Sequence, residues 1–185
     1  DEDGTQWYHT GDIGTIDEDG YVKITGRKKT VIVLRTGKKV SPVIVEGEIA
    51  LDRHIAHICL IGDDLKYLVA IVEPNWEYLG EWLEQQGIGP WKAEDLEVEK
   101  GITKEEYAEI IERRKQIIQK PEVIEFYNGI IQNRQKNFSV FEQVKNFALV
   151  ADDWNEYNVL TPSMKMKRST INEFYKQQII DIYQE

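Results

Sequence analysis

Residues 55–72 read IAHICLIGDDLKYLVAIV and contain the strongest β-strand signal of the chain. The runs 55–61 and 67–72 are rich in β-branched and other apolar residues, which favours β-strands. The five residues between them have a length compatible with a hairpin turn. Cys59 falls on the side of the alternation that faces a core. The stretch therefore predicts two paired strands at the centre of a small sheet.

Short β-elements and one helix are predicted on the N-terminal side of this pair. Residues 14–25 alternate around an Asp-Glu-Asp-Gly turn and predict a hairpin. A short apolar strand is predicted over 31–34. A helix is predicted over about 42–51, with Ser41 as its N-cap and Pro42 at the first helical position.

The signal on the C-terminal side is mainly helical. From about 75 to 138 the apolar spacing is that of helices, and Pro121 can start one of them. Residues 103–106 and 170–173 each have Thr followed three positions later by Glu, the pattern of a capping box. A last strand is predicted over 146–150, before the terminal helix.

This order of elements predicts an α+β fold, in which a small mixed β-sheet is flanked by helices and carries a helical insertion at about 75–140. The first hairpin stands apart because it has too few partners to bury its own face. We therefore expect residues 1–27 to be the C-terminal edge of a larger neighbouring domain and residues 28–185 to form a second domain.

Composition excludes several classes of protein. The 185 residues are 41% hydrophobic and 30% charged, which is typical of a soluble globular chain. The net charge of -10 argues against a nucleic-acid partner, since such proteins are usually basic. Apolar runs are far shorter than the roughly 20 residues of a membrane span. The single cysteine excludes an internal disulfide, and no export leader opens the sequence, so a cytoplasmic location is expected.

The average charge hides a sharp division. Residues 1–20 hold seven acids and no Lys or Arg, whereas residues 21–42 hold seven bases and no acid. A base-only block points to an anionic partner nearby. The alternative is an ordinary lysine-rich hairpin whose charges are solvated.

Two features before residue 30 suit nucleotide chemistry. Asp12 follows a glycine, and its two carboxylate oxygens can accept hydrogen bonds from a vicinal diol such as ribose. Arg27 follows Gly26, and its donor fork fits phosphate or ribose oxygens. In isolation, a turn aspartate and a solvated linker arginine are the alternatives. His9 has no partners at ligand spacing, so a metal site is not expected.

Two later features bring a backbone or a cation to a ligand. Gly37 has no side chain to keep a ligand from the backbone, although an ordinary glycine turn explains it equally. Lys165 lies in a basic loop, LTPSMKMKR at 160–168, before the terminal helix. A lysine there can reach a phosphate or carboxylate on its long stem. The alternative is ordinary surface charge.

Taken together and in order, these segments resemble the adenylate-forming, or AMP-binding, enzymes. The segments YHTGDIG at 8–14, DGY at 19–21, ITGRKK at 24–29 and the Lys165 loop carry the resemblance. The Val40-Ser41-Pro42 turn and the LTPSMK form of the last loop are similar to the long-chain fatty-acid–CoA ligases. Thr30 and the Arg35-Thr36-Gly37 triplet depart from the usual pattern of that branch.

The resemblance implies a reaction in two halves, with ATP, Mg²⁺, a fatty acid and CoA as reactants and cofactors. Asp12 and Arg27 would bind the nucleotide, and Lys165 would reach the α-phosphate and the carboxylate during adenylation. Lys29 would be the hinge about which the small domain rotates, and Gly37 and Lys38 would lie against CoA.

The resemblance also places the phosphate loop, the Mg²⁺ ligand and the acyl groove in a large N-terminal adenylation domain. That domain would be this chain's own partner, and any peripheral membrane contact would be made through it. The fragment alone is then expected to be inactive. Two alternatives stay open, namely an acyl–acyl-carrier-protein ligase and a non-catalytic nucleotide- or protein-binding module.

Overall fold

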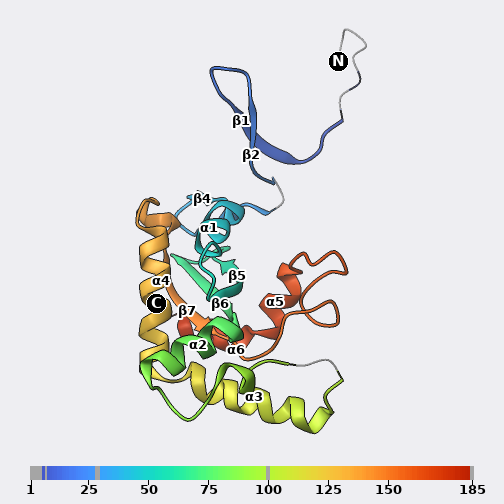
Figure 1. Ribbon diagram of the computed structural model, residues 1–185. Helices are drawn as coiled ribbons and strands as arrows, with labels where there is room; N and C mark the ends of the chain where they lie inside the picture. The colour runs from blue at the N-terminus through green and yellow to red at the C-terminus, as the bar shows by residue number, and fades with distance from the viewer. Residues whose placement is uncertain (1–5, 7, 28–29, 99–100, 184–185) are drawn as a thin grey trace.

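The computed structural model of the chain describes residues 6, 8–27, 30–98 and 101–183. Its centre is a three-stranded sheet of β5 (Ile55–Ile61), β6 (Leu68–Pro74) and β7 (Val144–Leu149), in the order β5-β6-β7. β5 pairs antiparallel with β6, and β6 pairs parallel with β7. The prediction of a small mixed sheet with flanking helices is therefore confirmed (Figure 1).

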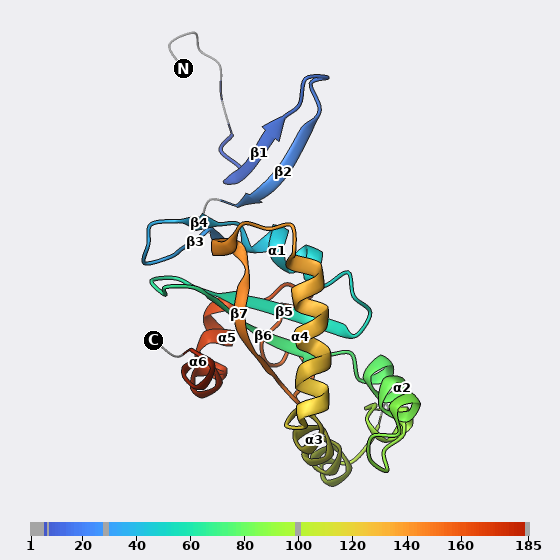
Figure 2. The same cartoon turned by 90° about the vertical axis from the view of Figure 1, so that its left-hand side faces the viewer.

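Helices cover both faces of this sheet, as Figure 2 shows for α4 on one side and α5 and α6 on the other. One face contributes Ile58, Leu60 and Ala70 to a core shared with α1 (Pro42–Ile49), α2 (Trp76–Gln86) and α4 (Pro121–Gln135). The other face contributes Cys59 and Ile71 to a second core with α5 (Arg168–Phe174) and α6 (Lys176–Ile182). Since neighbouring strand residues point to opposite faces, one apolar run supplies both cores.

The segment before the sheet follows its sequence signals closely. β3 (Ile32–Val33) and β4 (Lys39–Val40) pair antiparallel, and α1 follows directly. Ser41 is the N-cap residue of α1 with extended backbone angles, although its side chain makes no capping hydrogen bond. Pro42 opens the helix as predicted. The helix ends at Ile49, two residues before the predicted end at about 51.

The predicted insertion contains α2, a 3₁₀ turn η2 (Ala93–Asp95), α3 (Lys104–Ile118) and α4. The capping box at the start of α3 is confirmed. Glu106 N donates to Thr103 Oγ1 at 3.2 Å, and Thr103 N donates to Glu106 Oε2 at 2.7 Å. α4 is tied to the sheet because Tyr127 Oη donates to the carbonyl oxygen of His54 at 2.8 Å.

The C-terminal region departs from its prediction in two places. β7 starts at Val144, after the 3₁₀ turn η3 (Val140–Glu142), rather than at residue 146. The second capping box was wrong, because α5 begins at Arg168 with Lys167 as N-cap and makes no side-chain cap. The chain then breaks at Tyr175 into α6. Trp154 Nε1 donates to Tyr175 Oη at 2.9 Å, so the break accommodates a buried tyrosine.

The first hairpin is formed by β1 (Asp12–Ile16) and β2 (Val22–Arg27), paired antiparallel. Asp17 Oδ1 closes its turn by accepting hydrogen bonds from the backbone N–H groups of Asp19 and Tyr21. Every residue of β1 is exposed, and the hairpin projects away from the rest of the chain in Figures 1 and 2. The predicted boundary after residue 27 stays a prediction.

Candidate functional site

Asp12 and Arg27, the two predicted nucleotide-binding residues, are Cα partners in the β1–β2 ladder. Cα atoms of residues that face each other across an antiparallel pair lie about 5 Å apart. The backbone N–H of Asp12 donates to Thr10 Oγ1 at 3.1 Å, which supports the turn that leads into β1. The hairpin register therefore brings these two positions together, whereas the sequence only showed that both follow a glycine.

The predicted hinge residue Lys29 lies outside the described residues. The structure describes β2 as far as Arg27 and the chain again from Thr30. The hinge role therefore stays a prediction.

Gly37 and Lys38 form the exposed turn between β3 and β4. Gly37 N donates to the Leu34 carbonyl at 2.8 Å, and Leu34 N donates to the Lys38 carbonyl at 2.9 Å. Gly37 has φ of 79°, a left-handed angle that favours glycine, and the space where a Cβ would lie is open. Lys38 Nζ lies 5.3 Å from the ring centroid of Phe141. A ligand can therefore approach this backbone closely.

Lys165 lies on a tight loop between Leu160 and Met166, which form an antiparallel bridge. Thr161 organises the loop: its N–H donates to the Lys165 carbonyl at 2.8 Å, and its Oγ1 accepts from Lys165 N at 3.0 Å. Met164 adopts a left-handed φ of 59°, which turns the chain back. Lys165 itself is exposed, and among the described residues no side chain pairs with its ammonium group. Hydrogen bonds within the loop thus fix its backbone, while the Lys165 side chain is exposed on the surface.

Buried residues that sequence reasoning missed fix the base of this loop. Trp154, Val159 and Leu160 enter the second core. Glu73 of β6 accepts from Trp154 N at 3.0 Å, and its other oxygen lies 2.6 Å from His57 Nδ1. Burial raises the pKa of Glu73, while the hydrogen bond with His57 opposes that rise. The only sequence signal was an acid inside an otherwise apolar strand.

Arg168 fixes the other end of the loop, three residues after the lysine. Its guanidinium pairs with the Glu46 carboxylate and donates to the Leu60 carbonyl at 3.3 Å. Glu46 also accepts from Leu60 N at 2.7 Å, which satisfies a donor on the edge strand β5. Burial raises the pKa of Glu46, and the Arg168 charge opposes that rise. Since an arginine stays protonated, we treat the pair as ionic.

Other chemistry is not supported by the described residues. Burial raises the pKa of the Cys59 thiol to about 12, so it is not a thiolate nucleophile at neutral pH. No cluster of three or more His, Cys, Asp or Glu in the described ranges fits a metal ion. None of the described helices is both long and apolar enough to cross a membrane.

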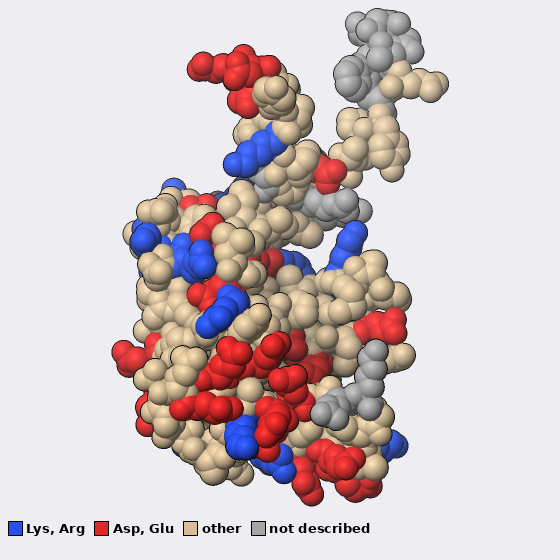
Figure 3. All heavy atoms as spheres, viewed as in Figure 1, with Lys and Arg blue, Asp and Glu red and all other residues tan. Residues whose placement is uncertain are grey.

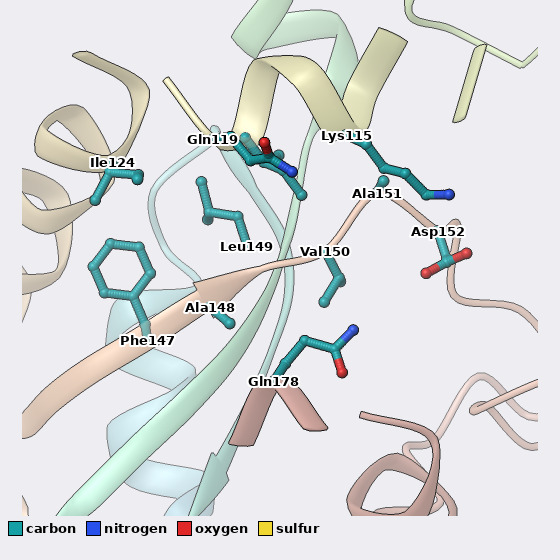
Figure 4. A pocket seen from close by; sticks show the side chains of 11 residues that line it. Lys115, Gln119, Ile124, Phe147, Ala148, Leu149, Val150, Ala151, Asp152 and Gln178 are labelled. Carbon is teal, nitrogen blue, oxygen red and sulfur yellow. The ribbon is translucent and has the colours of Figure 1, made fainter. Parts of the chain in front are cut away.

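One cavity is lined by residues outside the predicted site. A cavity of about 500 Å³ lies where α3, α4 and α6 meet β7, and Figure 4 shows Lys115, Phe147 and Gln178 around it. It contains none of the predicted site residues. In Figure 3 acidic side chains gather around α2 and α3, and others occupy the tip of the hairpin.

Comparison with known proteins assigns these elements. Residues 29–86 match the family model described as AMP-binding enzyme C-terminal domain. This match spans the segment from β3 to α2. This family was expected from the motifs around Asp12 and Lys165, and the expectation is confirmed.

Curated proteins are similar in sequence to nearly the whole chain. Long-chain-fatty-acid–CoA ligase 6 of Mus musculus is 32% identical over 99% of this chain and 23% of the relative. A long-chain-fatty-acid–CoA ligase of Mycobacterium tuberculosis is 28% identical over 96% of this chain and 26% of the relative. The chain therefore spans about a quarter of the length of the curated relatives it matches.

Solved structures share the fold. The adenylation domain of a carboxylate reductase from Mycobacterium chelonae aligns with a TM-score of 0.68 at 20% identity, over 98% of this chain and 23% of that chain. The corresponding domain from Segniliparus rugosus, in complex with AMP and a co-purified carboxylic acid, aligns with a TM-score of 0.65 at 19% identity, over 98% of this chain and 23% of that chain. At these identities the likeness concerns the fold alone.

Proposed function

We propose that this chain is the C-terminal part of an ATP-dependent long-chain fatty-acid–CoA ligase. The observation that carries the proposal is the Lys165 loop, which presents an exposed ammonium group from a backbone held by Thr161 and by the buried Val159 and Leu160 at its base. Asp12 and Arg27, opposed across the hairpin, provide the second support. The names of the relatives point to a fatty acid and CoA as the substrates.

In the first half-reaction, a carboxylate oxygen of the fatty acid attacks the α-phosphorus of ATP. The new P–O bond gives an acyl-adenylate, and pyrophosphate leaves with the electron pair of the broken bond. Negative charge grows on the phosphate oxygens in the transition state, where a fixed cation stabilises it. Lys165 supplies that cation, while Asp12 accepts from the ribose hydroxyls and Arg27 binds the same ribose or a nearby phosphate.

In the second half-reaction, the CoA sulfur attacks the acyl carbonyl, and AMP leaves as the thioester forms. A lysine needed only for adenylation must first be withdrawn, which a mobile domain can do. We assign residues 1–27 to the edge of the N-terminal adenylation domain and 28–185 to the mobile domain, with Lys29 as hinge. Gly37 and Lys38 then form part of the CoA face.

Two features of the described residues concern the N-terminal domain. Ile16, Tyr21 and Ile24 of the hairpin are each more than half exposed, an apolar surface that such a domain would cover. The described residues do not fit a Mg²⁺ site, so the metal that supports ATP chemistry is assigned to that domain. The same proposal places the enzyme in the cytoplasm, with any peripheral membrane contact made through the N-terminal domain.

The test is Lys165→Ala in the full-length protein, with the two half-reactions assayed separately. Adenylation, followed by ATP–pyrophosphate exchange, should fall at least about 100-fold because a transition-state cation is lost. Thioester formation from supplied acyl-adenylate and CoA should survive. Lys176→Ala, an exposed lysine at the start of α6, is the matched control. Equal loss in both half-reactions would contradict the assigned role of Lys165.

A further inference from the structure

The loop that carries Lys165 has two stems, and an arginine side chain holds each of them: Arg114 is buried and Arg168 is partly buried. The first stem, residues 151–155, leaves β7, and the second leads into α5 at Arg168. Arg168, at the second stem, pairs with Glu46 of α1 and donates to the Leu60 carbonyl of β5. The first stem is hydrogen-bonded to Arg114 of α3, a helix of the insertion. Nothing in the sequence connected this insertion with the lysine.

Arg114 is only 1% exposed, yet it makes four hydrogen bonds. Its Nη1 donates to the Ala151 carbonyl at 3.1 Å and to Asp153 Oδ1 at 2.8 Å. Its Nε and Nη2 donate to the Leu96 carbonyl at 2.9 and 2.6 Å. The guanidinium also lies 4.4 Å from the ring centroid of Trp76. This planar fork joins α2, Leu96 at the end of η2 and the first stem, which a lysine cannot do.

A continuous set of hydrogen bonds leads from Asp153 toward the lysine. The side-chain amides of Asn155 and Asn158 donate to the Asp153 carbonyl at 3.1 and 2.8 Å. Leu160 N donates to the Asn155 carbonyl at 2.9 Å, and Leu160 closes the loop by bridging to Met166. The position of Arg114 therefore constrains the backbone that presents Lys165.

We propose that Arg114 is a positioning residue for Lys165, through which the helical insertion sets the geometry of adenylation. This inference rests on the proposed function, because it gives the insertion a role in placing the adenylation lysine. The physical reason is that a small misplacement of a catalytic group is costly, about 100-fold for a shift near 1 Å. Arg114 does not touch substrate, and it acts only through the first stem.

The first experiment measures both half-reactions in full-length Arg114→Lys and Asp153→Asn. Arg114→Lys keeps the charge but loses the fork, and Asp153→Asn weakens the acceptor with little change in shape. Adenylation should fall between about 10-fold and 100-fold in Arg114→Lys, in kcat more than in KM. Thioester formation from supplied acyl-adenylate should be retained. Arg113→Lys is the matched control, since the Arg113 guanidinium contacts Glu109 and the Asp95 carbonyl and not the first stem.

The second experiment combines Arg114→Lys with Lys165→Ala. If Arg114 acts only through Lys165, adding Arg114→Lys to the Lys165→Ala variant should change the residual adenylation rate less than about two-fold. A further large loss of adenylation in the double variant would overturn the proposal. So would equal loss in both half-reactions, or no loss of adenylation, in Arg114→Lys alone. If Arg114→Lys does not fold, Asp153→Asn decides the matter by the same criteria.

Hydrogen exchange in the 185-residue chain gives a readout that is independent of activity. Amide exchange over residues 155–167 should rise about 10-fold or more in Arg114→Lys, since a hydrogen bond to a charged group is lost. Arg113→Lys should leave it unchanged, and an unchanged rate in Arg114→Lys would overturn the proposal. If Lys165→Ala does not reduce adenylation, the proposed function fails, whereas exchange still reports whether Arg114 holds the loop.

Discussion

The β1–β2 hairpin and the three-stranded sheet have similar alternating strands but opposite environments. Ile16 of β1 is 70% exposed, whereas Ile71 of β6 is fully buried between helices. The hairpin is held by its own ladder and by Asp17 in its turn. The sheet is covered on both faces by elements distant in sequence. The same strand chemistry therefore contributes to global stability only where other elements cover it.

The largest expected difference concerns buried and exposed acids. Glu46→Ala should lower the free energy of unfolding by about 3–5 kcal/mol, because it leaves the partly buried Arg168 without its ionic partner. Glu18→Ala, at the exposed tip of the hairpin, should produce no measurable change. Urea denaturation of both variants measures the difference. A stability loss in Glu46→Ala as small as that in Glu18→Ala would show that the pair does not hold α5.

Two turn glycines with similar left-handed backbone angles test the comparison next. Gly37 has φ of 79° and Gly20 has φ of 85°, so alanine is strained at both. Gly37→Ala should cost about 1–2 kcal/mol in global unfolding, since its turn joins strands whose Ile32 and Val40 enter the core. Gly20→Ala should strain only the hairpin. If thermal denaturation shows equal shifts, the hairpin unfolds together with the sheet.

A smaller effect is expected from deleting one methyl group in each region. Ile71→Val should lower the free energy of unfolding by about 1 kcal/mol, because the cavity lies in the second core. Ile16→Val removes the same group from an exposed strand and should leave the denaturation midpoint unchanged. Destabilisation by Ile16→Val would mean that the hairpin packs against the rest of the chain in solution.

The smallest effect is a pH dependence from Glu73 on the buried sheet. Burial raises its pKa above the ordinary 4.5, despite opposition from the hydrogen bond with His57. The folded carboxyl binds its proton more tightly than the unfolded one, so its contribution to stability declines as pH rises through the folded pKa. Glu73→Gln removes this decline. The free energy of unfolding of Glu73→Gln, minus that of the unmodified chain, should therefore increase from pH 4.5 toward neutrality. Urea denaturation at several pH values measures this difference, and a difference that does not change with pH would contradict the prediction.

Local signals predicted much of the fold. The Thr103–Glu106 capping box and the start of α4 at Pro121 depend on neighbours within one helical turn, and both are confirmed. The similar pattern at 170–173 failed because Arg168, held by Glu46, starts the helix earlier. A cap competes with tertiary contacts that a local pattern does not contain.

The site was predictable to a similar extent. Lys165 was recognised as a loop cation, and the structure shows it exposed on such a loop. Its supports were missed, because Arg114 and Glu46 look like ordinary helix-surface charges in the sequence. The opposition of Asp12 and Arg27 also depends on register, which includes an irregularity between Ile13 and Gly14.

Local sequence patterns were enough to predict the order of elements, the charge division and the residues that resemble the motifs of AMP-binding enzymes. These depend on spacing, capping and side-chain chemistry within short segments. The contact of the insertion with the first stem of the lysine loop through Arg114, and of α1 with α5 through Glu46, became visible in the folded chain. Such contacts join residues far apart in the chain, and they form where packing of the cores brings buried charges within hydrogen-bonding distance.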